Sequence, residues 1–395
     1  MVHSSSSSHD PFWACLPALN PAQHNTIIIG GGVVGLSVGW LLSEMGARVT
    51  LIDARTPDAH PASLAAAGML APGFEGSRSP QERAIEAMGW ESLSYWPQFA
   101  SALEQASGID IDFRQEGTLG LAATEEQATQ LETLYCQMTS EGHTVAFLDQ
   151  QGVLLREPNL SQHVSAGLFS SSEWQVDPVF LLKALLKAFL QANGTYIGGH
   201  RAVQIKPAES NSPGDHKHNV VAAKTDNAAQ TQIFTARTVI LATGAFLDDL
   251  DTDFPLPELI PVKGEAMALL PENHQSPPLL RHVIRNANVY LCPKSDGRII
   301  IGATSITGDN SRTVNPDHLA ALYEHARQLV PDIDQMKKGP SWSGLRPITV
   351  DGRPLIGPLT DGPAGIIAAL GHHRNGILLS PLTARKIAIQ LAQEA

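Results

Sequence analysis

The sequence has few cysteines for its length. Cys15, Cys136 and Cys292 are the three among 395 residues. They lie too far apart for a disulfide framework or for the paired spacing of a cysteine-based metal site. We therefore predict no metal, a reducing compartment and a cytoplasmic location.

Basic runs and long apolar runs are also missing. The formal charge is −12, from 27 Lys and Arg against 39 Asp and Glu. This balance argues against nucleic acid or an anionic membrane surface as the main partner. No uninterrupted apolar segment is long enough to cross a bilayer. The sequence predicts neither a nucleic-acid nor a membrane partner.

The first 24 residues contain a serine run, Ser4–Ser8, and three prolines. They lack a positively charged start followed by an apolar core, so they do not have the pattern of a signal peptide. We expect residues 1–24 to form a disordered extension outside the fold.

A glycine-rich stretch near the start predicts dinucleotide binding. Thr26–Ile29 is a short β-branched run typical of a buried parallel strand. Gly30, Gly32 and Gly35 then form a G-x-G-x-x-G turn into an apolar helix, and a second strand ends at Asp53. The glycines allow a tight turn and close approach to a pyrophosphate at the helix N-terminus, and the acid accepts hydrogen bonds from ribose hydroxyls. A glycine-rich turn without chemical meaning would not require Asp53.

A chain of this length is expected to contain more than one lobe. Residues 195–240 are rich in strand-forming residues and are expected to form a three-stranded meander. The apolar strand 238–245 that follows ends in Ala-Thr-Gly. This arrangement is typical of flavoproteins with two dinucleotide-binding units, which favours FAD over NAD. We predict an α/β fold in which a Rossmann-like FAD-binding domain with a β-meander is joined to an α+β substrate domain built on an antiparallel sheet. The FAD-binding domain is expected at 25–110, 175–245 and 341–395, the substrate domain at 111–174 and 246–340, and a closing helix over Gly376–Ala392.

Seven motifs, from residue 25 to the C-terminus, resemble in order those of the D-amino-acid-oxidase family of flavoproteins. They are residues 30–53, Ala65–Pro72, Val262–Glu265, Gly302–Thr304, Trp342–Pro347, Asp351–Pro354 and Gly371–Ile377. Two of them, A-A-G-M-L-A-P and G-H-H-R-N-G-I, are most similar to glycine oxidases of the thiamin pathway. The resemblance implies non-covalent FAD and oxidation of glycine, sarcosine or small D-amino acids to imines by hydride transfer to flavin N5. It further implies oxygen as acceptor, peroxide, ammonia and a 2-oxo acid as products, a homo-oligomer, and possible transfer of the imine to a thiazole synthase.

Four residues are predicted for the substrate site. Arg346 matches the carboxylate clamp, and its planar fork suits a carboxylate. Tyr290 matches a position that closes the carboxylate side, Arg374 is expected beside substrate or flavin, and Met69 against flavin or substrate. Arg346, Tyr290 and Arg374 are the predicted catalytic residues. The alternatives are a structural arginine, a core aromatic, a surface ion pair and a packing methionine.

The predicted cofactor site draws on distant segments of the chain. Backbone N–H groups at the start of the closing helix are expected to stabilise negative charge near flavin N1 and C2=O. No catalytic role is assigned to the two histidines before it. The predicted cofactor-binding residues are Gly30, Gly32, Val33, Val34, Gly35, Asp53, Ala54, Ala66, Ala67, Gly68, Met69, Val203, Thr243, Gly244, Gly344, Arg346, His373, Arg374, Asn375, Gly376, Ile377 and Leu378.

Three other functions remain open at this point. A D-amino-acid dehydrogenase would pass its electrons to a quinone or another acceptor, and the sequence does not distinguish it from an oxidase. A tRNA-modifying flavoprotein is disfavoured because no basic run is present. A non-catalytic dinucleotide-binding module would need neither Arg346 nor Tyr290.

Overall fold

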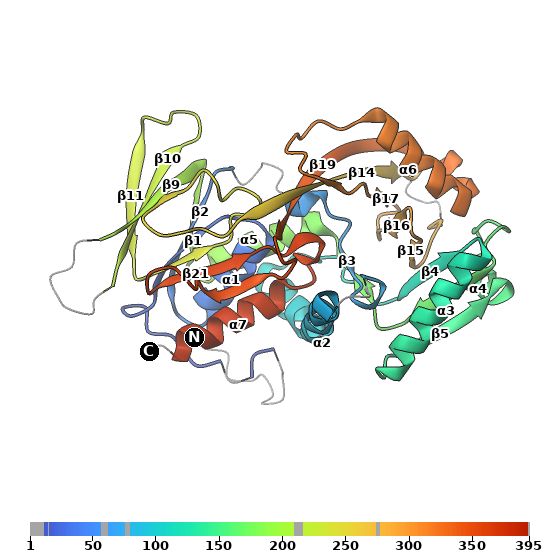
Figure 1. Cartoon of the computed structure of the whole chain (residues 1–395), viewed down its shortest axis with the longest axis horizontal. Coiled ribbons are helices and arrows are strands. Elements are labelled where there is room, and N and C mark those ends of the chain that lie inside the picture. Colours follow the sequence, from blue (N-terminus) through green and yellow to red (C-terminus); the bar gives the residue numbers. More distant parts are fainter. Residues whose placement is uncertain are drawn as a thin grey trace.

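The computed structural model describes residues 12–14, 16–56, 62–75, 80–208, 216–273 and 277–393. Two lobes lie side by side in Figure 1. The first is built on a six-stranded, mainly parallel sheet and the second on a nine-stranded, mainly antiparallel sheet. The predicted fold class is confirmed.

The six-stranded sheet has the order β20-β21-β12-β1-β2-β8. All neighbours pair in parallel except β20 and β21, which are antiparallel. The sheet brings together strands from the beginning, the middle and the end of the chain. They are β1 (Asn25–Ile29), β2 (Arg48–Asp53), β8 (Thr195–Gly198), β12 (Thr238–Leu241), β20 (Leu355–Pro358) and β21 (Ile366–Leu370).

Alternate side chains of β1 are buried on opposite faces of this sheet, as the period of two in a strand requires. Ile28 packs against the layer of helices, whereas Ile27 and Ile29 pack against the meander. The first layer contains α1 (Val33–Glu44), α2 (Pro80–Ser107), α5 (Pro178–Gln191) and α7 (Ser380–Gln393). The other layer is the predicted meander, in the order β11 (Thr231–Ala236), β10 (His218–Lys224), β9 (His200–Pro207) and β13 (Asp251–Thr252).

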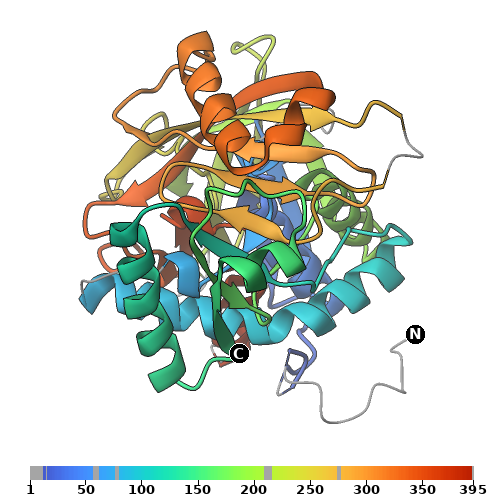
Figure 2. The same ribbon diagram turned by 90° about the vertical axis from the view of Figure 1, so that its right-hand side faces the viewer.

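The second lobe surrounds its own apolar core. Its sheet has the order β18-β14-β17-β16-β15-β4-β6-β5, and β19 pairs with β14 outside this path. Figure 2 shows α6 (Pro316–Leu329) and α3 (Glu125–Ser140) on its flanks, and α2 crossing below. A short helix, α4 (Gln150–Arg156), follows β5. The strands are β4 (Thr118–Ala122), β5 (Val145–Asp149), β6 (Ala166–Ser170), β14 (Leu259–Leu270), β15 (Val283–Arg285), β16 (Tyr290–Pro293), β17 (Ile299–Gly302), β18 (Ile306–Thr307) and β19 (Lys337–Thr349).

The long antiparallel pair of β14 and β19 connects the two lobes (Figure 1). Leu259, at the start of β14, packs into the core beneath the six-stranded sheet, and Leu269, near its end, packs into the core of the second lobe. The middle of the pair, where Gly264 faces Gly344, therefore lies at the junction of the lobes.

Three boundaries differ from the sequence-based expectation. Residues 12–14 and 16–24, expected to be disordered, are placed against the core, because Phe12 and Leu19 supply apolar side chains that are 0% and 5% exposed. The chain returns to the nine-stranded sheet at β14 and leaves it for the last time at Thr349, later than residues 246 and 341. The closing helix begins at Ser380 rather than at Gly376, because a single 3-10 turn, His373–Asn375, and a further turn precede it.

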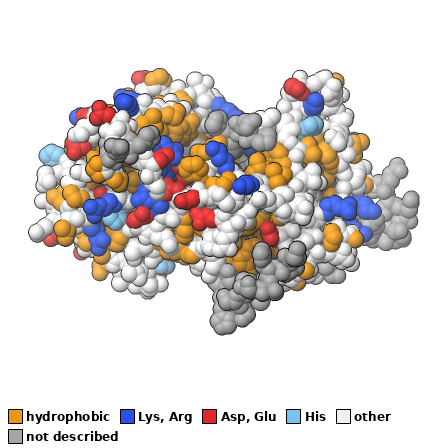
Figure 3. All heavy atoms as spheres, turned by 180° about the vertical axis from the view of Figure 1, so that it is seen from behind, with side chains coloured by type: hydrophobic (Ala, Val, Ile, Leu, Met, Phe, Trp, Pro, Cys, Tyr) orange, Lys and Arg blue, Asp and Glu red, His pale blue; other side chains and the backbone are white. Residues whose placement is uncertain are grey.

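Charged side chains are scattered over the face shown in Figure 3, with basic and acidic groups interspersed among uncharged areas. Within the described ranges, no helix is both long and apolar enough to span a bilayer.

Candidate active site

The glycine-rich turn packs β1, α1 and β12 closely together. A Cβ at Gly30, whose φ is +112°, would lie 2.2 Å from the carbonyl oxygen of Ala242. A Cβ at Gly35 would lie 1.9 Å from the carbonyl oxygen of Gly30. These two glycines therefore allow the close packing of the turn, which a side chain at either position would prevent.

The N-terminus of α1 opens into a cavity of about 130 Å³. Its N-cap residue, Gly32, has no side chain to satisfy the first N–H groups, although the Val33 N–H donates to Ser63 Oγ at 3.1 Å. The partial positive charge at this end favours a bound anion. The predicted cofactor residues that line the cavity are Gly32, Val33, Val34, Ala66, Gly244, Gly344, Arg346, His373, Arg374, Gly376 and Ile377.

Asp53 lies at the end of β2 and is buried. Its carboxylate accepts a short hydrogen bond from the Gly31 N–H, and it pairs with the Arg55 guanidinium, whose Nη2 lies 2.9 Å from Oδ2. The Arg55 backbone N–H also donates to Oδ1 at 2.8 Å. Arg55 therefore occupies acceptor positions on Asp53 to which the predicted ribose hydroxyls would donate.

The other predicted cofactor residues lie outside this cavity. Ala67, Gly68, Met69 and Asn375 line a neighbouring cavity, and Leu378 lines a third. Gly30, Gly35, Asp53, Ala54, Val203 and Thr243 line none of the three. The Thr243 hydroxyl is buried with no hydrogen-bond partner among the described residues.

The neighbouring cavity, of about 260 Å³, contains all four predicted substrate residues: Met69, Tyr290, Arg346 and Arg374. It shares residues with the first cavity, including Ala66 and Ile377, so the two adjoin. The four side chains come from β3 (Met69–Leu70), β16, β19 and the loop before α7. The fold therefore brings together residues that lie as much as 305 positions apart.

Arg346 lies over a glycine of the paired strand. A Cβ at Gly264 would lie 2.2 Å from Arg346 Nη2 and 2.4 Å from Cζ. On the other side, Arg346 Nη1 donates to the Thr304 carbonyl oxygen at 3.1 Å. The bare backbone of Gly264 and the Thr304 carbonyl together fix the position of the guanidinium.

Tyr290 has an equivalent position over a second glycine. It pairs with Gly302 across β16 and β17, and a Cβ at Gly302 would lie 2.3 Å from the tyrosine hydroxyl oxygen. The ring therefore lies flat against the neighbouring strand, which leaves room in the cavity.

The segment that carries Met69 is fastened to the second lobe. Trp342 Nε1 donates a hydrogen bond to the Ala65 carbonyl oxygen at 3.1 Å, and Lys294 Nζ donates one to the Ala67 carbonyl oxygen at 2.8 Å. Lys294 is 2% exposed and also donates to Val176 O at 2.8 Å and to Gln175 Oε1 at 3.1 Å. Burial lowers the pKa of Lys294, but three acceptors match its three donors.

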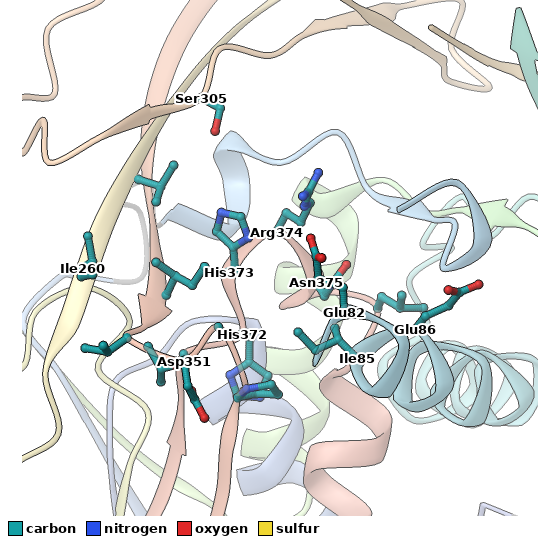
Figure 4. A pocket seen from close by; sticks show the side chains of 18 of the residues that line it. Glu82, Ile85, Glu86, Ile260, Ser305, Asp351, His372, His373, Arg374 and Asn375 are labelled. Carbon is teal, nitrogen blue, oxygen red and sulfur yellow. The ribbon is translucent and has the colours of Figure 1, made fainter. Parts of the chain in front are cut away.

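A third cavity, of about 670 Å³, lies beyond the loop before α7. Figure 4 shows His373, Arg374 and Asn375 of this loop between Ser305 and the α2 residues Glu82 and Glu86. The loop therefore separates the large cavity from the other two, which also use His373 and Arg374.

The first histidine of this loop has a local role. Burial lowers the pKa of His372 to about 4, and its Nε2 lies 2.9 Å from the Thr383 hydroxyl of α7. A neutral, hydrogen-bonded imidazole is consistent with its exclusion from the predicted catalytic residues.

Comparison with known proteins identifies the family. The sequence model of the DAO family, described as FAD dependent oxidoreductase, matches residues 25–389. The chain belongs to this family. FAD is accordingly the cofactor of this FAD-dependent oxidoreductase.

Individual relatives agree with this assignment. The chain is 34% identical over 370 residues to a glycine oxidase of Geobacillus kaustophilus, covering 93% of this chain and 92% of the relative. A crystal structure of glycine oxidase from that organism superposes with a TM-score of 0.82 at 32% identity, covering 94% of this chain and 95% of the other. A bifunctional protein ThiO/ThiG of Trichormus variabilis is 31% identical over 92% of this chain, which spans 52% of that relative.

The residues of the first cavity fit FAD. The open N-terminus of α1 at Gly32 suits its pyrophosphate. Gly344 and Gly376 leave the cavity wall without side chains where a flat ring would have to approach backbone. The roles of the individual residues remain predictions.

Sequence reasoning missed several residues of the site. Gly264 and Gly302 lie inside quoted motifs, yet nothing local indicates that they lie beneath Arg346 and Tyr290. Arg55 lies two residues after Asp53, so it could have been found as a charge near an acid. Lys294 gave no signal, because its partners lie 118 to 227 positions away in the chain.

Proposed function

We propose that the protein is an FAD-dependent oxidase of small amino acids, with glycine, sarcosine and small D-amino acids as substrates. The observation that carries the proposal is the gathering of Arg346, Tyr290, Arg374 and Met69 around one cavity that adjoins the cofactor cavity. The glycine oxidases among the relatives support the same substrate class.

The residues of this chain supply binding and orientation. The Arg346 guanidinium grips the substrate carboxylate, and the Tyr290 hydroxyl donates a hydrogen bond to it from the neighbouring strand. When bound, FAD supplies the acceptor for the hydride on the substrate α-carbon. Met69 adds an apolar side chain to the cavity wall beside Ala67 and Gly68, which limits the room for water around the reacting groups. Arg374 contributes positive charge at the edge that the two cavities share.

The products proposed are an imine that hydrolyses to a 2-oxo acid and ammonia, and hydrogen peroxide from oxygen. We further propose that the imine serves thiazole formation for thiamin, because ThiO/ThiG relatives combine a region similar to this chain with another in one protein. The cytoplasmic location, the homo-oligomer and the non-covalent binding of FAD remain predictions.

The test is an anaerobic titration of the purified FAD-loaded protein with glycine, then with D-alanine. We expect the flavin absorbance to bleach with at least one of them and to recover, with peroxide formation, when air enters. Slow recovery in air would instead favour a dehydrogenase with a quinone or another acceptor, and no bleaching with any small amino acid would refute the proposal.

A pair of arginine variants sharpens this test. Arg346→Ala should retain FAD but lose bleaching at substrate concentrations that saturate the wild-type protein. Arg327→Ala, which removes an exposed arginine paired with Glu324 on α6, should behave as wild type. Equal bleaching of Arg346→Ala and wild type would exclude the clamp.

A further inference from the structure

One threonine connects the proposed carboxylate clamp to a buried acid. The Thr304 carbonyl oxygen accepts from Arg346 Nη1 at 3.1 Å. The same residue contacts Glu265 at three points: the Glu265 N–H donates to Thr304 Oγ1 at 2.9 Å, the Thr304 N–H donates to the Glu265 carbonyl at 3.3 Å, and Thr304 Oγ1 donates to Glu265 Oε2 at 3.4 Å. Thr304 therefore has little freedom to move independently of Glu265.

The Glu265 carboxylate is 0% exposed and collects donors from three parts of the second lobe. Oε1 accepts from the Asn315 N–H at 2.9 Å and lies 3.3 Å from Lys263 Nζ. Oε2 lies 2.6 Å from His318 Nδ1 of α6. Burial raises the pKa of Glu265, but the hydrogen bonds from Asn315, His318 and Lys263 lower it by more, so the pKa lies below its usual value and the group is ionised.

Lys263 extends this cluster to the segment after β18. Its Nζ donates to Asp309 Oδ2 at 3.0 Å and to Ser311 Oγ at 2.9 Å. The cluster thus holds β14, the segment from residue 304 to 315 and the start of α6 around one carboxylate. Ala303, Thr304 and Ser305, at the start of that segment, line the cavity that contains Arg346.

Such a cluster fits a requirement of the clamp. A guanidinium fork binds a carboxylate with two parallel hydrogen bonds only when its plane is fixed, and supporting hydrogen bonds supply that precision. Gly264 fixes one face of Arg346, and the Thr304 carbonyl is the acceptor that fixes its edge.

We infer that Glu265 is a positioning residue, which holds the Thr304 carbonyl so that Arg346 presents its guanidinium to the substrate carboxylate. The inference rests on the proposed function, since it assigns Arg346 as the clamp. Glu265 itself lines none of the three cavities and does not touch the substrate.

The experiment measures carboxylate binding separately from turnover. Acetate is titrated into the FAD-loaded protein and its Kd is read from the change in the flavin spectrum, while KM and kcat are measured with the preferred amino acid. The variants are Thr304→Val, which removes the hydroxyl but keeps the shape, Thr304→Ser, which restores it, and Glu265→Gln. Thr129→Val on the outer helix α3 is the matched control.

We expect Thr304→Val and Glu265→Gln to raise the acetate Kd and the KM about tenfold, with kcat changed less than threefold. Thr304→Ser and Thr129→Val should stay within twofold of wild type. If Glu265→Gln does not fold, the comparison of Thr304→Val with Thr304→Ser tests the inference alone.

A purely structural role predicts a different result. The thermal midpoint or FAD occupancy of Thr304→Val would then fall while its acetate Kd stayed within twofold of wild type, and that outcome would overturn the inference. Failure of the proposed function would appear in the wild-type protein alone, which would then neither bind acetate nor be bleached by amino acids. That result would also refute the inference about Glu265.

Discussion

Substitution of Gly264 by alanine tests the position of Arg346 directly. The new Cβ would lie 2.2 Å from Nη2, 2.4 Å from Cζ and 2.6 Å from Nη1 of Arg346. Because carbon and nitrogen atoms in contact lie about 3.5 Å or more apart, the guanidinium must move by roughly 1 Å. The atoms that move are the end of a flexible side chain, so the fold itself should tolerate the change.

The expected loss is in carboxylate binding. A hydrogen bond to a charged group contributes about 1.5–3 kcal/mol, and a displaced fork loses at least one such bond to the substrate. At about 1.4 kcal/mol per factor of ten, the acetate Kd and the KM for amino acid should rise about 10- to 100-fold. The assay is the same spectral titration, with the thermal midpoint and FAD content as measures of folding.

A double-mutant cycle shows whether the effect passes through Arg346. In an Arg346→Ala background the added Cβ at Gly264 has nothing to displace, so it should cause no further loss of acetate affinity. If the two substitutions reduced the affinity independently, or if Gly264→Ala bound acetate as wild type does, the reasoning from this contact would be wrong.

Three further predictions concern stability, each measured as the free energy of unfolding in urea. Lys294→Met leaves the buried carbonyls of Ala67 and Val176 without their hydrogen-bond donor, so it should lower the free energy of unfolding by about 2–5 kcal/mol. A loss below about 1 kcal/mol would contradict the role of Lys294 in holding these carbonyls. Phe12→Ala should cost about 3–5 kcal/mol, because this side chain is 0% exposed in the core, whereas a disordered N-terminal segment predicts no change. Glu173 is fully buried, and burial raises its pKa from 4.5 to about 7. Since the unfolded state ionises first, wild-type stability relative to Glu173→Gln should fall by roughly 3 kcal/mol as the pH rises from about 4.5 to 7. A pH-independent difference would refute the assignment.

The sequence predicted best what local pattern determines. The turn at Gly30, Gly32 and Gly35 lies between the expected strands. The cap of α5 is equally local, because Asp177 accepts from the first N–H groups of the helix and Pro178 occupies its first turn. These features depend on neighbours a few residues apart, where the φ of a glycine or one capping oxygen decides the structure.

Features that depend on distant partners were not predictable. The serine-rich start of the chain predicts disorder, although Phe12 lies in the core and its carbonyl accepts a hydrogen bond from Arg385 of α7 at 2.7 Å. The closing helix was placed four residues too early, because backbone pairing of His372 with Ile348 of β19 holds the preceding loop. Tyr290 and Arg346 were predicted to lie in one site, and the structure places them together, but the glycines beneath them were invisible in the sequence.

The order of strands in the parallel sheet has a consequence for biosynthesis. β1 and β2 are made long before β21 and the segment from Gly371 to Ile377, most of which lines the cofactor cavity. A nascent chain stopped before β21 lacks one wall of that cavity and leaves an edge of β12 unpaired. The cofactor cavity is therefore complete only once the chain has been made as far as Ile377, and chains truncated before β21 should remain colourless.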